Sequence, residues 1–284
     1  MIPNPFEYSR ATSLDDAIAK LRASAGGAKL VAGGHSLVPL MKLRLSEPAT
    51  LIDIARIPGL SGIQEKGAAI EIGAGTVHHD VASSALLRKV CPVVAECAAE
   101  IGDPQVRNRG TLGGSLAHAD PAADYPAVML ALDASIQVKG PNGARAIKAS
   151  DFFQGMFTVD LKADEVIVSV QFPPTQTAAY AKLHQRASHF AIVGVAAALD
   201  VKGGVIQSAR VGLTGATSSA MRLTEVEAAL KGKTASASTF EAAAALGANV
   251  KDVSSDIHAS AEYRRAMIRV FTVRALTQAL ARVG

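Results

Sequence analysis

Ala32-Gly33-Gly34-His35-Ser36 is the stretch that decides the fold of this chain, together with a second glycine-rich stretch, Thr111-Leu112-Gly113-Gly114-Ser115. Each places paired glycines after a run of residues typical of a strand. Each also adds hydroxyl side chains beside backbone N–H groups that no side chain blocks. Backbone of this kind can approach a pyrophosphate closely, so two such loops predict one extended phosphate ligand held from two sides. Neither has the spacing of Gly-x-Gly-x-x-Gly or of a P-loop.

The composition of the 284 residues is that of a globular protein. Hydrophobic residues make up 49% and charged residues 19%, which excludes a disordered chain. Aromatic residues make up only 4% and Trp is absent, so the core must be built from Ala, Val, Leu and Ile. The net charge of +4 comes from scattered Lys and Arg without interleaved aromatic residues, so we expect no nucleic acid partner.

The sequence predicts neither a secretion signal nor a membrane span. Residues 1–5 contain no basic n-region, and no apolar h-region follows them. The most apolar stretch, residues 191–199, has the length of a strand, whereas a membrane helix needs about 18 or more apolar residues. We therefore expect a cytoplasmic protein with no integral membrane segment.

The side chains that commonly carry chemistry form no recognisable set. Cys91 and Cys97 lie six positions apart, which matches neither a zinc site nor an iron–sulfur ligand set. We expect two buried or half-buried thiols on a helix and no metal site. No paired carboxylates and no nucleophile with an adjacent base stand out, so we predict no catalytic residue.

The first residues predict a small α/β unit. Ser13 can cap a helix that carries Ile18 and Leu21 on its apolar face. A strand at residues 29–32 leads into the first glycine loop, and a further strand is expected at residues 51–54.

A second unit is expected from about residue 57 onward. Hairpin turns are predicted at Lys66-Gly67 and at residues 141–143. Helical periodicity between residues 79 and 101 is interrupted by Pro92. The strand at residues 166–172 ends at Pro173-Pro174, which we take as the boundary between a domain of residues 1–174 and one of residues 175–284.

The C-terminal domain is expected to be α+β, with a three-stranded antiparallel sheet followed by helices. The expected strands lie at residues 180–183, 191–200 and 205–213, and the expected helices at about residues 223–230, 239–246 and 261–283.

The two glycine loops and their flanks resemble the FAD-binding medium subunit of the molybdenum hydroxylases (the xanthine dehydrogenase family), closest to the carbon monoxide dehydrogenase type. The most specific blocks are residues 32–39 and 103–114, and the likeness extends from Phe6-Glu7-Tyr8 to the last helix. The resemblance implies an α+β fold. Its FAD-binding domain would be of the PCMH (vanillyl-alcohol-oxidase-like) type, with two α/β subdomains at about residues 1–56 and 57–174.

The same resemblance implies that both loops and four further positions hold FAD. More distant flavoproteins with a Gly-Gly-His loop attach the flavin covalently through that histidine, but the family resembled here binds FAD non-covalently. The implied cofactor-binding residues are Ala32, Gly33, Gly34, His35, Ser36, Leu37, Thr111, Gly113, Gly114, Ser115, Asp124, Ile167, Lys182 and Phe190.

Four of these positions have plain structural alternatives or a distinct role. Asp124 precedes an apolar helical run and could be a helix N-cap, a carboxylate near the ribityl chain or the flavin ring, or both. Ile167 could be an ordinary core residue, and Lys182 a solvated lysine on a strand. Phe190 would shield one face of the flavin.

Other residues near the loops are expected to be structural. His118 is expected to be packed or hydrogen-bonded, and Asp120-Pro121 to start a turn. One of Arg107 and Arg109 is expected to support the second loop or a partner surface. Ser115 stands where many relatives carry Asn or Asp, and His189 replaces an Asp that is frequent in this segment, which bears on the electron acceptor.

The function implied is that of an oxidoreductase subunit whose FAD passes electrons from [2Fe–2S] clusters to an external acceptor. Molybdopterin is expected only on a large partner subunit and the clusters only on a small one, in a dimer of heterotrimers. The likeness over the whole length favours carbon monoxide as the substrate of the assembly, with aldehydes and N-heterocycles as other classes.

Two other functions stay open at this point. A stand-alone FAD oxidoreductase acting on its own small substrate would need an acid or base near the flavin, and the candidates are Tyr180, His184 and His189. A flavin-free scaffold would keep the fold without the ligand, although the intact glycine loops argue against it.

Overall fold

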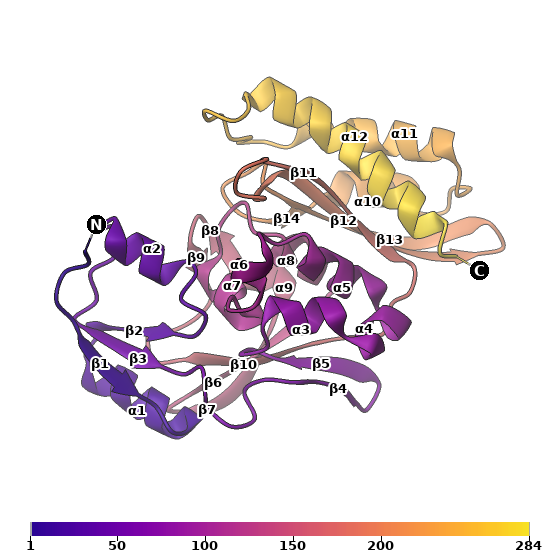
Figure 1. The fold of residues 1–284 in the computed structure, drawn as a ribbon. Coiled ribbons are helices and arrows are strands. Elements are labelled where there is room, and N and C mark those ends of the chain that lie inside the picture. Colours follow the sequence, from indigo (N-terminus) through magenta and orange to yellow (C-terminus); the bar gives the residue numbers. More distant parts are fainter. Residues whose placement is uncertain (1, 284) are drawn as a thin grey trace.

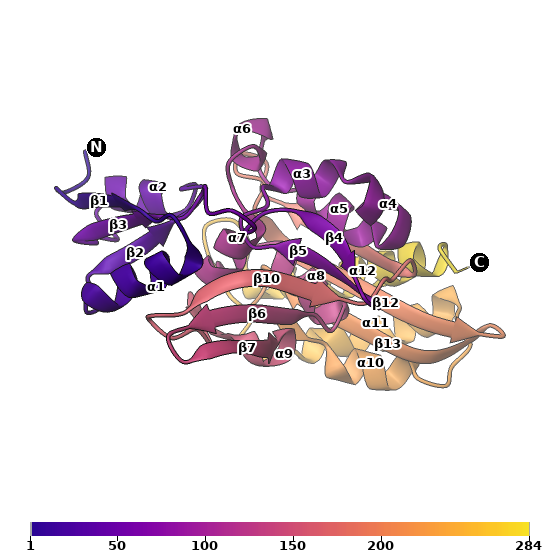
Figure 2. The ribbon, with the colours of Figure 1, turned by 90° about the horizontal axis from the view of Figure 1, so that it is seen from below.

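A computed structural model describes residues 2–283, which stack as a sheet, a group of helices, a second sheet and a second group of helices (Figure 1). A smaller sheet formed by the N-terminal residues stands beside the first of these sheets (Figure 2). Among the described residues, no helix combines the length and the apolar character needed to cross a bilayer.

The small N-terminal sheet is parallel, with the strand order β1-β3-β2. Its strands are β1 (Glu7–Arg10), β2 (Ala28–Val31) and β3 (Thr50–Asp53). Helix α1 (Leu14–Ala23) connects β1 to β2, and at its start Asp16 N donates a 3.1 Å hydrogen bond to Ser13 Oγ, which confirms the predicted cap. The first glycine loop joins β2 to helix α2 (Leu37–Lys42).

The central sheet is antiparallel, with the strand order β4-β5-β10-β6-β7. The strands are β4 (Ile63–Lys66), β5 (Ala69–Gly73), β6 (Ser135–Gly140), β7 (Gly143–Lys148) and β10 (Val166–Phe172). The chain leaves the sheet after β5 and returns at β6. Strand β10, the last of the five in the chain, then inserts between β5 and β6. Between β7 and β10 lie helix α9 (Ala149–Phe152) and a hairpin of β8 (Phe153–Gly155) and β9 (Thr158–Val159).

The segment between β5 and β6 is helical and covers one face of the central sheet (Figure 1). Its helices are α3 (His78–Ser83), α4 (Ala85–Val90), α5 (Pro92–Ala99), α6 (Pro104–Arg107), α7 (Leu112–His118) and α8 (Tyr125–Ala131). Pro92 separates α4 from α5, as predicted, since proline fits the first turn of a helix but not its interior. Cys91 and Cys97 are buried, as expected. Cys97 lies on α5, but Cys91 is not on a helix, because it stands at the break between α4 and α5 that Pro92 imposes.

The C-terminal sheet is antiparallel, with the strand order β11-β12-β13-β14. The strands are β11 (Ala178–His184), β12 (Ala191–Lys202), β13 (Val205–Thr214) and β14 (Met221–Arg222). The first three match the predicted meander. The fourth was not predicted, because it has only two residues, which pair with Gly212 and Leu213 and are too few to show an alternating pattern.

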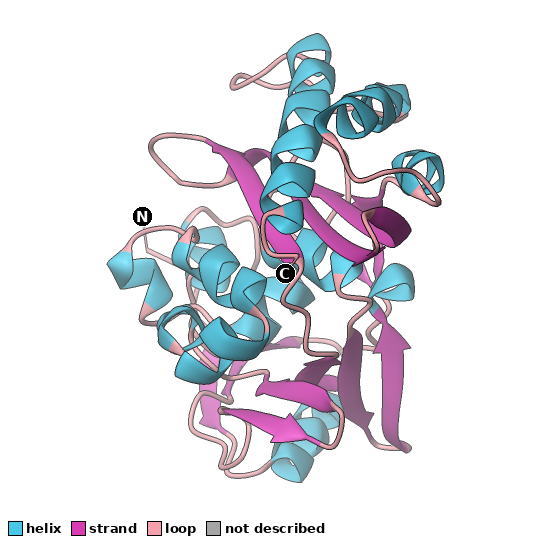
Figure 3. Cartoon of the chain, turned by 90° about the vertical axis from the view of Figure 1, so that its right-hand side faces the viewer, coloured by secondary structure: helices cyan, strands magenta, loops and turns pink. Residues whose placement is uncertain are grey.

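Both faces of this sheet are covered. Helices α10 (Thr224–Leu230), α11 (Ala237–Leu246) and α12 (Ala261–Leu280), with a 3₁₀ turn η1 (Gly247–Asn249), pack on one face (Figure 3). Helix α8 packs on the other. Strand β12 therefore buries Ala196 and Ala198 toward α8 and Val195 and Ala197 toward the helical layer, following the two-residue period of a strand.

Candidate functional site: two neighbouring glycine loops

The first glycine loop lies in direct backbone contact with the two residues that precede the second, Arg109 and Gly110. A Cβ atom on Gly33 would stand 2.1 Å from Arg109 O and 2.8 Å from Gly110 Cα. No side chain fits such a gap, because real Cβ contacts essentially never fall below 3.0 Å. The absence of a side chain at Gly33 therefore lets two segments that are far apart in the chain form one surface.

The first loop presents a row of unused donors. Gly34 has φ +74°, a left-handed conformation that glycine adopts without strain, and Ser36 returns to the right-handed region. Among residues 2–283, no acceptor receives the backbone N–H groups of residues 33–37. Successive N–H groups in such alternating conformations form a concavity that binds anions.

His35 is exposed, and its Nδ1 lies 3.1 Å from Gly33 O. The His35 ring therefore contacts the backbone of its own loop.

The second loop differs from the sequence expectation, because its N–H groups are already used. Leu112 N and Gly113 N donate to the carbonyls of Thr76 (3.0 Å) and Ala74 (2.8 Å), and Gly114 N donates to Thr111 Oγ1 (3.1 Å). A Cβ atom on Gly113 would stand 2.5 Å from Ala74 Cβ. Gly113 therefore lets α7 dock on the end of β5, and Ser115 in the same turn is half-buried.

His78 was not singled out from the sequence, yet it links the residue just before the second loop to helix α8. Its N–H donates to Gly110 O (2.9 Å), and its Nδ1 lies 3.3 Å from the hydroxyl of Tyr125. Burial lowers the pKa of His78 to about 4, so the ring is neutral near pH 7. No motif marks it, because both partners come from much later in the chain.

Asp124 and Lys182 form a buried ion pair between the helical layer and the C-terminal sheet. Lys182 Nζ lies 2.8 Å from Asp124 Oδ1 and donates to Glu100 O at 3.0 Å. The hydroxyl of Tyr180 donates to the same carboxylate at 2.6 Å. Burial raises the pKa of Asp124, while Lys182 and Tyr180 oppose that rise.

Two structural alternatives are therefore wrong. Asp124 stands at the N-cap position of α8 but its side chain does not cap the helix, because its φ and ψ are helical (−79° and −47°) and it accepts no capping hydrogen bond. Lys182 is not a solvated lysine, because its side chain is only 2% exposed. Gly194, which pairs with Lys182 across the ladder, leaves room for the Tyr180 ring: a Cβ there would stand 2.3 Å from the Tyr180 hydroxyl oxygen.

The two remaining predicted positions differ in exposure. Ile167 is buried in β10 beside a register shift between Ile167 and Ser169, so its side chain belongs to the core. Phe190 is 46% exposed and ends the connection between β11 and β12. Just before it, His189 has φ +60° and its ring stacks on that of His184 at 5.4 Å.

The expected structural roles near the loops are also visible. The His118 ring lies 5.0 Å from the Phe157 ring, and burial lowers the pKa of His118. Arg107 Nη1 donates to the carbonyls of Ile101 (3.0 Å) and Gly102 (2.8 Å), so Arg107 supports the approach to the second loop.

Of the candidates for an acid or base of a stand-alone enzyme, Tyr180 donates its hydroxyl hydrogen to Asp124, and the rings of His184 and His189 stack on each other.

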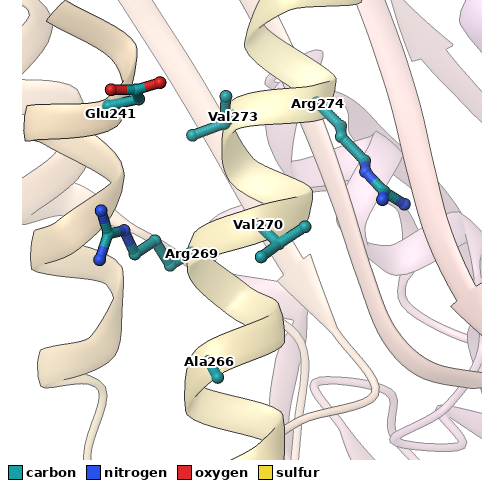
Figure 4. Close-up of a pocket in the computed structure, with 6 residues that line it drawn as sticks. All are labelled: Glu241, Ala266, Arg269, Val270, Val273 and Arg274. Atoms are coloured by element: carbon teal, nitrogen blue, oxygen red, sulfur yellow. The ribbon is translucent and has the colours of Figure 1, made fainter. Parts of the chain in front are cut away.

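A separate groove of about 610 Å³ lies between α11 and α12, lined by Glu241, Arg269 and Arg274 among others (Figure 4). The C-terminal sheet separates it from the glycine loops (Figure 1), so it does not belong to this site. Within the described part of the chain, no group of three or more His, Cys, Asp or Glu could hold a metal ion.

The donors of the first loop fit a pyrophosphate, since adjacent N–H groups without an internal acceptor suit an anion. Comparison with known proteins agrees. Residues 4–175 match the family described as the FAD binding domain in molybdopterin dehydrogenase, and residues 178–279 match the CO dehydrogenase flavoprotein C-terminal domain.

Individual relatives cover nearly the whole chain. The carbon monoxide dehydrogenase medium chain of Hydrogenophaga pseudoflava is 40% identical, with 99% of each chain covered. The nicotine 6-hydroxylase medium subunit of Paenarthrobacter nicotinovorans is 36% identical, with 97% of each covered. A solved structure of carbon monoxide dehydrogenase from Hydrogenophaga pseudoflava superposes with a TM-score of 0.97 at 41% identity, covering 100% of both chains. This chain therefore belongs to the FAD-binding flavoprotein subunits of the molybdopterin dehydrogenases.

Proposed function

We propose that this chain binds FAD non-covalently and serves as the flavin subunit of a molybdenum-containing carbon monoxide dehydrogenase. The observation that carries the flavin site is the row of unused N–H groups at residues 33–37, closed on one side by the second loop. The medium chains of carbon monoxide dehydrogenases support the choice of substrate for the assembly.

The residues divide the work of holding the cofactor. The N–H groups of residues 33–37 bind the pyrophosphate, and the hydroxyls of Thr111 and Ser115 bind phosphate or ribityl oxygens. Ala32 belongs to the same loop. Gly113 brings α7 against Ala74, and the exposed Gly114 admits the ligand by carrying no side chain. The resemblance is the support for these assignments, together with the exposure of Gly114 and the half-exposure of Ser115.

The remaining four residues would lie around the flavin itself. Asp124 accepts hydrogen bonds from the cofactor while Lys182 fixes its carboxylate. Ile167 contributes through its backbone, because its side chain is buried, and Phe190 covers one face of the ring system with its exposed side chain. Bound FAD would supply the acceptance of electrons and their release to an external acceptor; the chain binds, orients and electrostatically tunes it.

The proposed assembly contains two further subunits. A large subunit carries the molybdopterin centre and a small one carries [2Fe–2S] clusters, and two heterotrimers form the complex. Relatives named as medium chains or as subunits of dehydrogenase complexes support partner subunits. We further propose a cytoplasmic location, and a boundary between domains of residues 1–174 and 175–284, supported by the proline pair at 173–174.

The first experiment is a visible absorption spectrum of the purified full chain before and after FAD addition and desalting. We expect retained flavin that denaturation releases into solution. Flavin that stays on the denatured chain would contradict non-covalent binding, and a colourless protein even in the co-expressed complex would contradict the flavin site.

The second experiment addresses the assembly. The chain is co-expressed with its partner subunits, and the native mass of the complex is measured together with acceptor reduction by carbon monoxide and by an N-heterocycle. We expect turnover with carbon monoxide and none with the N-heterocycle. Turnover only with the heterocycle would replace carbon monoxide as the substrate while keeping the flavin role.

A further inference from the structure

The segment between the second loop and Asp124 is held by the C-terminal sheet through its main chain. Helix α7 ends at Ala119, which has φ +47°, and the chain then crosses to α8 through residues 120–124. Three successive carbonyls of this crossing accept hydrogen bonds from the other domain. Pro121 O accepts from Gly215 N (2.8 Å), and Ala122 O accepts from Ala191 N (3.2 Å).

Thr214 completes this set of contacts. Its buried hydroxyl lies 2.6 Å from Ala123 O and 3.0 Å from Pro121 O. The next residue, Asp124, is held by Tyr180 and Lys182 of the same sheet. These polar anchors of residues 121–124 thus come from one end of the hairpin formed by β12 and β13 and from β11.

That end of the hairpin lacks its own ladder. The register of β12 and β13 ends at the pair Gly194 and Thr214, so the chain beyond it, including Ile192 and Gly215, has no strand partner across this pair. Gly215 has φ +82°, and a Cβ there would stand 2.6 Å from Ala191 O, so the two backbones touch without pairing.

Arg264 of α12 replaces the missing ladder. Its Nη1 donates to Ile192 O and to Gly215 O, both at 2.6 Å, and its Nη2 donates to Asp256 Oδ2 at 2.6 Å. The residue is only 3% exposed, and its buried Nε has no partner among the described residues. Burying a cation costs free energy unless it is paired and hydrogen-bonded. Of the three hydrogen bonds that Arg264 donates, two go to the diverging backbones and one to the Asp256 carboxylate.

We infer that Arg264 is a positioning residue for the flavin site, acting through Gly215, Ala191 and Thr214 on the carbonyls of residues 121–123. The guanidinium fixes the spacing of the two backbones, and that spacing sets where Asp124 and the end of α7 stand. Helices α12 and α8 lie on opposite faces of the C-terminal sheet (Figure 1), so the action passes through the sheet. The inference rests on the proposed flavin site at residues 32–37 and 111–124.

The test compares Arg264→Lys with Arg282→Lys in the full chain. Lysine keeps the charge but cannot reach two carbonyls and a carboxylate together. Arg282 is the matched control: it also joins the two domains, through Glu96 at 2.8 Å and through Ala178 O, but it does not contact residues 119–124 or their anchors. The readouts are the FAD dissociation constant from flavin fluorescence and the exchange of the amide hydrogens that residues 119–124 carry, Pro121 excepted, in flavin-free protein.

We expect Arg264→Lys to weaken FAD binding roughly ten-fold and to speed exchange at residues 119–124, with Arg282→Lys changing neither while lowering the melting temperature. Equal FAD affinity and equal local exchange in the Arg264 variant and the wild type would overturn the inference, whatever the melting temperature. Wild-type protein that binds no FAD would count against the flavin site, and the exchange measurement would then still decide the role of Arg264.

A further pair of variants covers the case in which the Arg264 variant fails to fold. Thr214→Val removes the hydroxyl that reaches Pro121 O and Ala123 O, whereas Thr214→Ser keeps it. We expect the valine variant to reproduce the loss of FAD affinity and the serine variant to restore it. Both residues act on one segment, so the double variant Arg264→Lys/Thr214→Val should lose less than the product of the single losses. Unchanged affinity in Thr214→Val would overturn the route through residues 121–123.

Discussion

At the scale of single residues, Gly33 holds the two loops together by what it lacks. In Gly33→Ala the new Cβ would stand 2.1 Å from Arg109 O. Neither atom can rotate away, because the Cβ is attached directly to the backbone and the carbonyl is part of it. We expect FAD affinity to fall at least about ten-fold and stability to fall by about 1–3 kcal/mol. Titration with FAD and urea denaturation measure the two effects.

The control for this prediction is Gly155→Ala, since a Cβ there would meet only Thr158 Cβ at an ordinary 3.8 Å. It should leave FAD affinity unchanged. If Gly33→Ala behaves like Gly155→Ala, the contact between the loops is not what shapes the site.

Lys182 gives another prediction at this scale. In Lys182→Met the carboxylate of Asp124, only 4% exposed, loses its cation. We expect a loss of about 3–5 kcal/mol in the free energy of unfolding at pH 7. Burial already raises the pKa of Asp124, so the loss should shrink as the pH falls and the carboxyl is protonated. Urea denaturation at several pH values measures it.

The comparison variant is Asp124→Asn/Lys182→Met, which removes both charges and should recover part of the stability. A double variant as unstable as the sum of the two single variants would show that the charges do not act as a pair.

The sequence predicted individual residues well where the signal is local. The Ser13 cap and the helix break at Pro92 depend on neighbours within one turn. The partners of Asp124 could not be found this way, because Tyr180 lies 56 positions later in another sheet. Nor could the sequence distinguish the free N–H groups of one glycine loop from the occupied N–H groups of the other, since the difference depends on whether Ala74 and Thr76 lie alongside.

At the scale of elements, the central sheet contains a pH-sensitive cross-strand cluster. Glu71 on β5 is held by hydrogen bonds from Lys66, Gln171, Gln64 and Ser169. Burial acts to raise its pKa, but these bonds outweigh burial and lower the pKa to about 2 from 4.5. Because the folded value is the lower one, the stability it contributes is present above pH 4.5 and is lost as the pH falls toward 2.

We therefore expect Glu71→Gln to flatten the acid limb of the stability profile, by at most about 1.4 kcal/mol per pH unit. Urea denaturation between about pH 2 and pH 4.5 gives the slopes for both proteins. The exposed neighbour Glu65 is the control: Glu65→Gln should keep the wild-type slope. Identical slopes in wild type and Glu71→Gln would show that Glu71 does not contribute to the loss of stability at acid pH.

Elements with a long apolar pattern were predicted within a few residues, as for β12 and α12. The pairing order of the central sheet was not predictable. Strand β10 is inserted between β5 and β6, and no local pattern in the sequence encodes a pairing between strands so far apart in the chain. Strand β14 was missed because two residues show no periodicity.

At the scale of the whole molecule, the C-terminal sheet rests directly on α8. A Cβ on Gly212 would stand 2.2 Å from Ala127 O, so the strand and the helix meet backbone to backbone. All seven residues of α8 are buried. We expect a single unfolding transition in calorimetry for the wild type and two separate transitions for Gly212→Ala, in which the layers are forced apart. Two transitions already in the wild type would contradict this coupling.

Main-chain carbonyls are common to every residue type, so the grip on residues 121–123 does not depend on the side chains of that crossing. The contacts that do depend on residue type come from the C-terminal domain, from Thr214, Gly215 and Arg264. Chimeras that join the N-terminal half of this chain to the C-terminal half of a relative should accept a foreign half that supplies that hydroxyl, glycine and arginine, together with the tyrosine and lysine that hold Asp124. Exchange of modules within such enzymes thus depends on a few positions in the donor.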